Sequence, residues 1–174
     1  MIPDKLEDWN IQIIDCLIPL RDIESETFDF KGVDFKELSI HLCAMANTLG
    51  GTIVLSIDEV KDQQGHLTKY KKTGFANNKE DNVRNRVNNA MVNVEPIPNV
   101  SIRNVSDTNN KFYTVLKVGN ENSNKPYFVK GSGRCYVRIG ASSVPATRTA
   151  IINLFTIFSR SEIVLKNLEH LLIL

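Results

Sequence analysis

The sequence predicts an α+β domain in which helices pack on a mixed β-sheet. Three observations lead to this fold class. Apolar residues recur at the period of an amphipathic helix over residues 4–17 and 79–94. Residues 52–57, TIVLSI, form a continuous apolar run of strand length, which is typical of a central strand. Residues 100–105 and 111–118 are strand-like and flank the turn sequence SDTNN, which predicts a hairpin.

The length and composition are those of an ordinary globular domain. The chain has 174 residues, of which 42% are hydrophobic and 24% charged, so it can bury a core. Cys16, Cys43 and Cys135 lie far apart without a CxxC pair, so neither a disulfide framework nor a zinc site is expected. This usage is typical of a reducing compartment and predicts a cytoplasmic protein. We find no signal peptide and no apolar run near the roughly 20 residues that span a bilayer, so no membrane partner is expected.

The first predicted elements are a helix and a strand. The amphipathic helix over residues 4–17 ends at Pro19, because proline cannot continue a helix. Alternation over residues 27–31 predicts a strand with Phe28 and Phe30 on one face, ended by Gly32.

A second helix begins at Asp34, with Glu37 three residues later in the position of a capping-box partner. Nearly every residue after Glu37 is apolar or small, so this helix is predicted to be deeply buried. Gly50 is placed to end it in the left-handed conformation.

The rest of the chain alternates strands, loops and helices. A polar excursion after residue 57 turns near Gln64 and Gly65 and carries several lysines. The helix over residues 79–94 and the hairpin described above follow it. Residues 126–130 and 134–140 predict a second short hairpin around GSG, and the last helices come after it. The elements divide the chain into an N-terminal helix (1–19), a central domain (20–158) and a C-terminal helix (159–174).

Acidic residues gather where two of the predicted strands begin or end. Glu24 and Asp29 flank the start of the first strand, and Asp58 and Glu59 directly follow the apolar run. If the two strands are neighbours, Glu24, Asp29 and one acid of the pair converge. Hard cations such as Mg²⁺ and Mn²⁺ prefer such oxygen ligands. The structural interpretation is a solvated strand edge followed by a turn, and the functional interpretation is a metal or phosphate site. The residues alone leave both interpretations open.

The charge is unevenly distributed along the chain. Residues 1–60 hold four Lys/Arg and twelve Asp/Glu, whereas residues 61–174 hold seventeen and eight, giving balances of −8 and +9. A basic surface beside an acidic cluster is what a metal-dependent nuclease requires, and basic surface alone suits nucleic-acid binding. Candidate contacts with nucleic acid are Lys69, Lys71, Lys72, Lys130, Arg134, Tyr136 and Arg138, with Lys31 beside the acids.

Other motifs exclude several site classes. Neither GxxxxGK[ST] nor GxGxxG is present, so no nucleotide-phosphate loop is predicted. The three histidines share no metal-ligand spacing, and His41 is interpreted as a residue of the buried helix. No GxSxG sequence marks a nucleophile for a Ser/His/Asp triad.

Three blocks, read together over residues 20–155, resemble the Schlafen core, a divergent AlbA-type domain. The first is ESETFDFK, Glu24 to Lys31, with Asp29 in the second acidic place of the family pattern. The second is AMANTLGGTIVLSIDE, with Ser56 where the pattern has glycine and Glu59 where it has aspartate. The third is Pro126 with the two aromatic residues after it, followed by YVRIGASS at residues 136–143.

The resemblance implies a single Schlafen/AlbA-type lobe that binds RNA or DNA. Some family members resemble metal-dependent endoribonucleases that act on structured RNA such as tRNA. By that likeness Glu24, Asp29 and Glu59 are the expected catalytic and metal-binding residues for Mg²⁺ or Mn²⁺, with Lys31 at the scissile phosphate. The alternative is a non-catalytic DNA-binding, transcription-regulatory module, and an interaction domain for another protein is a third possibility.

The assembly expected from the resemblance is larger than one lobe. Members with two lobes in tandem form a groove, and a homodimer of this chain would rebuild it. The apolar segment over residues 164–174 is the expected interface, although a final core helix has the same pattern. The zinc-binding insertion of the nuclease members has no Cys/His counterpart in this sequence.

Overall fold

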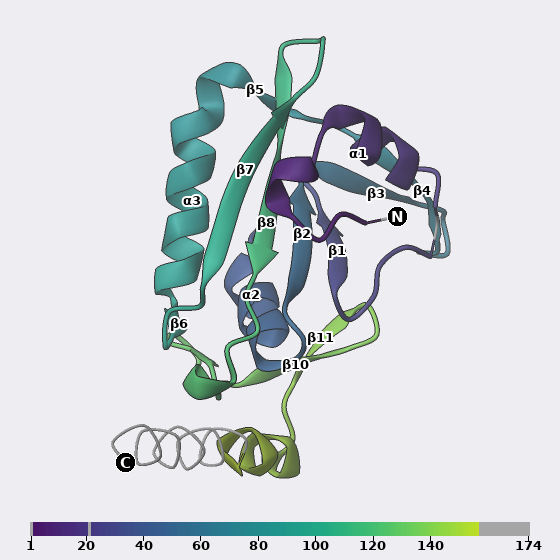
Figure 1. The fold of residues 1–174 in the computed structure, drawn as a ribbon. Helices are drawn as coiled ribbons and strands as arrows, with labels where there is room; N and C mark the ends of the chain where they lie inside the picture. The colour runs from purple at the N-terminus through teal and green to yellow at the C-terminus, as the bar shows by residue number, and fades with distance from the viewer. Residues whose placement is uncertain (1, 21, 157–174) are drawn as a thin grey trace, which may run out of the picture.

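The central element of the fold is a five-stranded mixed sheet. The structure, a computed structural model, describes residues 2–20 and 22–156. Strand β1 (Phe28–Lys31) runs parallel to β2 (Gly51–Leu55), and β2 pairs antiparallel with β8 (Lys111–Val118). Strand β8 also pairs antiparallel with β7 (Val100–Ser106) and β5 (Phe75–Ala76). The α+β class with a mixed sheet is confirmed (Figure 1).

The remaining elements surround this sheet. The helices are α1 (Ile11–Leu17), α2 (Leu38–Asn47) and α3 (Glu80–Val92), with short 3-10 turns η1 (Leu6–Asp8), η2 (Asn77–Lys79) and η3 (Asn122–Asn124). Residues 148–156 are also helical. The two-stranded pairs are β3 (Ile57–Lys61) with β4 (Leu67–Lys72), β6 (Val94–Glu95) with β9 (Phe128–Val129), and β10 (Tyr136–Ile139) with β11 (Ser142–Pro145).

Both faces of the sheet are covered, as the apolar run at residues 52–57 predicts. Ile53 and Leu55 pack with α2 and α3 in one core, and Val54 points to the other, which contains Trp9 and residues of α1, β3 and β4. Helices α1 and α2 therefore lie on opposite faces of the sheet (Figure 1). A strand covered on both sides has no polar face, which explains why its residues do not alternate.

The N-terminal helix predicted over residues 4–17 is interrupted. Trp9 separates η1 from α1, is 1% exposed and stacks on the Phe28 ring with centroids 6.2 Å apart. Asn10 then caps α1 by accepting a hydrogen bond from the Ile13 N–H at 3.1 Å. Burying the large indole and capping a new helix outweigh the continuation of one regular helix.

The predicted hairpin of residues 126–130 with 134–140 forms only one bridge, between Val129 and Arg134. Strand β9 pairs with β6 and β10 with β11 instead. The Asn47 side chain explains this difference, because its amide nitrogen donates to the carbonyls of Tyr127 and Tyr136, at 2.9 Å each. It thus takes acceptors that a ladder between the two segments would use.

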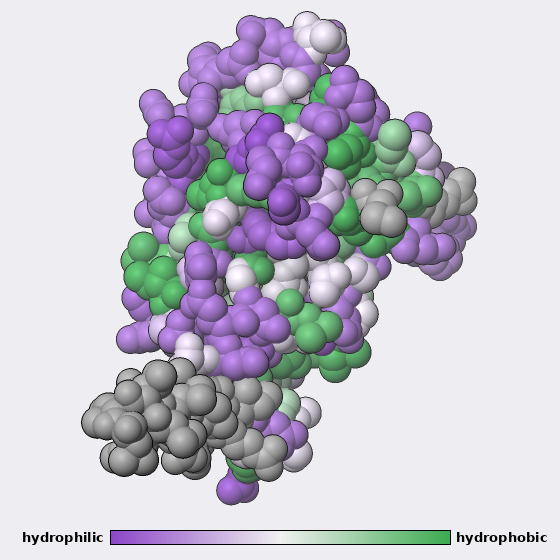
Figure 2. Space-filling view, in the orientation of Figure 1, coloured by the Kyte–Doolittle hydropathy of each residue, from purple (hydrophilic) through white to green (hydrophobic). Residues whose placement is uncertain are grey.

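The described surface is mainly hydrophilic in the orientation of Figure 1, with a hydrophobic group near the C-terminal end of α3 (Figure 2). Val92 and Ile97, both more than half exposed, belong to that part of the chain. Within residues 2–20 and 22–156, no helix is long and apolar enough to cross a bilayer. The C-terminal helix over 159–174 and the homodimer interface over 164–174 were predicted for residues outside this described part.

Ser56 lies between β2 and β3 in a conformation that favours glycine. Its φ is 76°, and it occupies the position where the family pattern has glycine. A side chain at such a φ costs about 1–2 kcal/mol relative to the right-handed regions. Ser56 is also fully buried, and its hydroxyl is one of the few buried side-chain polar atoms without a partner in the described chain.

We expect Ser56→Gly to raise the free energy of unfolding by about 1 kcal/mol, because it relieves the left-handed strain and removes the unpaired hydroxyl. Urea denaturation of the two proteins measures the difference. Ser56→Ala is the matched control, since it removes the hydroxyl but keeps the β-carbon. A gain from alanine as large as that from glycine would show that backbone strain is not the cause.

Candidate functional site

Asp29 lies on the face of β1 opposite Phe28 and Phe30, as the alternation predicts, but that face is not solvated. The Asp29 side chain is 0% exposed, because α2 and β10 cover it. Its Oδ1 accepts a hydrogen bond from Lys31 Nζ at 2.7 Å, and its Oδ2 accepts one from Arg138 Nη1 at 2.9 Å. Asp29 is therefore neither on a solvated strand edge nor accessible to an external ligand; it belongs to a buried cluster of ion pairs.

Arg138 is the buried partner in this cluster. Its side chain is also 0% exposed, and besides Asp29 it donates to the Ser25 carbonyl at 2.6 Å and to Ser143 Oγ at 3.3 Å. Arg138 therefore joins two segments distant in sequence, residues 25–29 and the β10–β11 hairpin. Arg138 and Tyr136 were predicted to contact nucleic acid from a strand face, but the structure places both in the interior, at 2% and 8% exposed.

His41 and Ser143 complete the surroundings of Asp29. The His41 Nδ1 lies 3.0 Å from Ser143 Oγ and 3.5 Å from Asp29 Oδ2. Burial, and then the positive charge of Lys31, lowers the pKa of His41 to about 4, so the imidazole is neutral at pH 7. The same ring nitrogen faces both the hydroxyl and the carboxylate, whereas a catalytic triad needs the two opposite nitrogens. These residues are therefore packed as a structural network.

Glu24 lies at the edge of this cluster and is half-buried. Its Oε1 accepts a hydrogen bond from the Phe30 N–H at 3.0 Å. Burial, followed by the negative charge of Asp29, raises the pKa of Glu24 from 4.5 to about 7, against the opposing effects of that hydrogen bond and Lys31. Glu59 contributes a smaller rise.

The other two acids of the predicted site have partners of their own. Glu59 Oε2 lies 2.7 Å from Lys61 Nζ on the exposed side of the β3–β4 hairpin. Asp58 accepts from the Val33 N–H at 3.2 Å and from the Thr73 hydroxyl, so it ties the end of β1 to the hairpin. Its role is to hold these segments together.

Glu24, Asp29 and Glu59 do share one neighbourhood. Burial, and then the charges of Glu24, Glu59 and Asp29, raise the pKa of Tyr70. Glu24 lies just before β1, which carries Asp29, and Glu59 lies on β3. These strands are neighbours, as the sequence prediction required, because β1 pairs with β2 and β3 follows β2 directly.

As arranged, these residues do not fit a divalent metal. Within the described residues, no three His, Cys, Asp or Glu side chains come close enough together to hold a metal ion. Both oxygens of Asp29 already face cationic nitrogens, and a second cation there would be repelled by Lys31 and Arg138.

The remaining predicted cations lie on the surface, in two places. Lys69 and Lys71 are exposed on β4, where Lys72 is paired with Asp15. Lys130 and Arg134 are exposed on the loop between β9 and β10. None of the ion pairs within residues 2–20 and 22–156 involves these last two residues or Lys69 and Lys71. Four of the seven predicted contacts are thus available to an external anion.

Comparison with protein-family models matches residues 24–147 to the family described as Schlafen, AlbA_2. This match covers more than half of the chain. The chain belongs to the Schlafen AlbA_2 family. The predicted resemblance is therefore confirmed.

Among solved structures, one similar fold is the solution NMR structure of the N-terminal domain of a putative ATP-dependent DNA helicase RecG-related protein from Nitrosomonas europaea. The TM-score is 0.58 at 18% sequence identity, over 79% of this chain and 90% of that one. At this identity the likeness concerns the fold. No curated protein was found to match the chain.

The Schlafen AlbA_2 blocks of this chain have structural roles that the sequence did not reveal. Asn47 binds the backbone of residues 127 and 136, and Thr48 Oγ1 accepts from the Arg138 N–H at 2.9 Å. Gly50 ends α2 at φ 70°, as predicted. Gly51 has φ 147°, and a β-carbon there would lie 2.4 Å from the Thr27 carbonyl oxygen. The ANTLGG block thus joins α2 to β1, β2 and β10.

Sequence reasoning missed one group of surface residues. Lys36, Arg86 and Asn89 line a cleft between α2 and α3 that no motif marks. The sequence offered only a weak sign of this cleft. Arg86 and Asn89 are three residues apart, so they share a face of α3 outside its apolar stripe.

We expect Asp29→Asn to lower the free energy of unfolding by about 3–5 kcal/mol, because it leaves the buried Arg138 charge without a counter-charge. Urea denaturation measures the loss. Asp34→Asn is the control, since Asp34 forms an exposed pair with Lys36 and its removal costs about 1 kcal/mol or less. Equal small losses for both variants would contradict a structural role of the Asp29–Arg138 pair.

We expect Glu24 to make the protein less stable as the pH rises. The folded state holds the Glu24 proton more tightly than the unfolded chain, so the free energy of unfolding falls between about 4.5 and about 7. Glu24→Gln removes this fall and is more stable than the wild type above pH 7, by the order of 1 kcal/mol after allowance for solvent screening. Urea titrations at several pH values measure it, with the exposed Glu26→Gln as control. Parallel pH profiles for wild type and Glu24→Gln would refute the assignment.

Proposed function

We propose that this chain is a nucleic-acid-binding domain that holds the phosphate backbone with exposed lysine and arginine side chains. The observation that carries the proposal is the availability of Lys69, Lys71, Lys130 and Arg134, which are exposed and have no carboxylate partner in the described chain. A cation that is not already neutralised can replace counterions on nucleic acid, which drives binding at low salt.

Two comparisons support this proposal. The family match spans residues 24–147, and the structural neighbour is a domain of a protein named as a putative DNA helicase-related protein. Cations that position a phosphate backbone carry no sequence information, so the four side chains predict binding with little sequence preference. Both RNA and DNA present the same phosphates to them. Binding without cleavage would make this role non-catalytic, as the DNA-binding, transcription-regulatory alternative expects.

A second candidate is a metal-dependent endoribonuclease acting on structured RNA such as tRNA. The observation that favours it is the common neighbourhood of Glu24, Asp29 and Glu59, where burial and then the charge of Asp29 raise the pKa of Glu24 to about 7. The ion pairs of Asp29 with Lys31 and Arg138 count against it, because they occupy the oxygens that Mg²⁺ or Mn²⁺ would need. Non-catalytic binding is the function that the arrangement supports better.

We expect the protein to bind labelled RNA and DNA with a steep salt dependence that EDTA does not change. Lys69→Gln combined with Lys71→Gln is expected to reduce the slope of log affinity against log salt by about 0.7–0.9 for each lost phosphate contact. Fluorescence anisotropy over a salt series measures this slope. Lys61→Gln on the same hairpin is the matched control, because Glu59 already compensates that charge.

Two results would decide against non-catalytic binding. Absence of binding to every RNA and DNA at low salt would refute the proposed function. Cleavage of tRNA that requires Mn²⁺ and is lost in Glu24→Ala would favour the endoribonuclease instead.

A further inference from the structure

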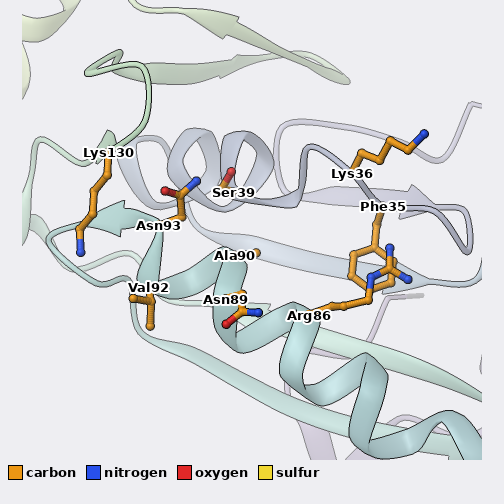
Figure 3. A pocket seen from close by; sticks show the side chains of 9 residues that line it. All are labelled: Phe35, Lys36, Ser39, Arg86, Asn89, Ala90, Val92, Asn93 and Lys130. Atoms are coloured by element: carbon orange, nitrogen blue, oxygen red, sulfur yellow. The ribbon is translucent and has the colours of Figure 1, made fainter.

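A cleft of about 700 Å³ lies between α2, α3 and the loop after β9, away from the buried acids. Its lining residues are Phe35, Lys36, Ser39, Arg86, Asn89, Ala90, Val92, Asn93 and Lys130 (Figure 3). They come from three separate parts of the chain, so the cleft exists only in the folded protein. Its volume lies within the range typical of ligand pockets, about 300–1,000 Å³.

The charge of the cleft has one sign. Lys36, Arg86 and Lys130 line it, and no carboxylate among the described residues does. The nearest acid with a recorded contact is Asp34, which is 64% exposed and lies 2.9 Å from Lys36 Nζ and 3.8 Å from Arg86 Nη2. One exposed carboxylate cannot compensate three cations, so the cleft is an attractive site for an anion.

Arg86 forms a rigid flat surface in this cleft. Its guanidinium carbon lies 3.9 Å from the centroid of the Phe35 ring, and its Nη1 donates to the Val33 carbonyl at 3.2 Å. Phe35 is held in turn by an edge contact with Phe75. Because the Arg86 side chain remains 37% exposed, the face of the guanidinium away from Phe35 is open to a second flat group.

The polar groups are spread along the cleft. Lys130 lies at the end near Val92, and Lys36 lies at the other end beside the Phe35–Arg86 pair (Figure 3). Ser39, Asn89 and Asn93 supply neutral hydrogen-bonding groups between these ends. A ligand that fits this arrangement is elongated, carries negative charge at both ends and has a flat group near one of them.

We propose that the α2–α3 cleft binds a single-stranded segment of nucleic acid. Lys36 and Lys130 contact two backbone phosphates, and one unstacked base lies on the Arg86 guanidinium with its edge toward Asn89. Bases stack on arginine planes and hydrogen-bond through their edges when they are not paired. A duplex keeps its bases inside its own stack and cannot make these contacts. This inference rests on the proposed function and names the form of nucleic acid that the domain prefers.

The test compares two arginines of the same helix. Arg86→Gln removes the flat cation of the cleft, whereas Arg84→Gln removes an equal charge from a residue that lies outside it and pairs with Glu80 and Asp81. Fluorescence anisotropy is measured with labelled single-stranded DNA and RNA of about 10 nucleotides, a length within known site sizes. A duplex of the same length and unlabelled AMP as competitor are the further arms.

We expect Arg86→Gln to weaken single-strand binding by about 10-fold, the effect of losing one stacked base, and Arg84→Gln by less than about 2-fold. Lys130→Gln is the second variant, because the side chain of Lys130 has no recorded partner in the described residues and its loss leaves the fold intact. It is expected to weaken binding by about 3-fold and to lower the salt slope by about 0.7. Circular dichroism and thermal melting check that each variant is folded.

The possible outcomes separate this inference from the proposed function. If the wild type binds no nucleic acid at all, both fail. If it binds but Arg86→Gln and Lys130→Gln bind as tightly as the wild type, only the cleft inference fails. Tighter binding of the duplex than of the single strand would likewise refute the cleft inference and leave the proposed function standing. Displacement of the oligonucleotide by AMP at comparable concentration would also overturn the inference, because it would identify the cleft as a mononucleotide site. If Arg86→Gln does not fold, Lys130→Gln decides.

Discussion

The buried pair of Asp29 and Arg138 is the interaction on which the arrangement of this domain depends. Two opposite charges without solvent contact must satisfy each other, because either one alone inside a protein is strongly unfavourable. The pair joins β1 to β10, which are far apart in sequence, and Arg138 also holds the Ser25 carbonyl and Ser143. The pair thus fixes the β10–β11 hairpin against the face of β1 that carries Asp29, the face that α2 also covers.

This constraint changes the meaning of the family blocks. Charged and polar residues in the family blocks are the usual candidates for catalysis, yet Asp29, Asn47 and Arg138 are all buried and hydrogen-bonded to other groups of the protein. Substitution of any of these three residues would lower the free energy of unfolding, and would not act directly on a ligand-binding site. Contact with an external ligand falls to residues outside these interactions, such as Lys69 and Lys130, whose charges are not compensated within the described structure.

The domain thus has two groups of charged residues in different environments, one buried and one exposed to solvent. Around Asp29, the cations Lys31 and Arg138 stabilise a buried carboxylate, whereas burial and then the charge of Asp29 raise the pKa of Glu24 beside it to about 7. At the α2–α3 cleft, Lys36 and Arg86 share the single exposed carboxylate of Asp34, and Lys130 has no carboxylate partner in the described chain, so positive charge remains for phosphates. The first arrangement holds the fold together, and the second leaves charge available for a partner.

The sequence by itself determined the local features of this protein. A continuous apolar run identified the central strand, a run of apolar and small residues identified the buried helix, and a turn sequence between two strand-like segments identified the β7–β8 hairpin. The alternation from residue 27 to 31 placed Phe28 and Asp29 on opposite faces. Each of these features depends on neighbours in the chain. The family blocks identified the fold. Only the tertiary structure decided that Asp29 is covered, that Arg138 is its partner and that Phe35 supports Arg86 over a cleft. These depend on contacts between segments distant in sequence, which a pattern of residue types does not encode.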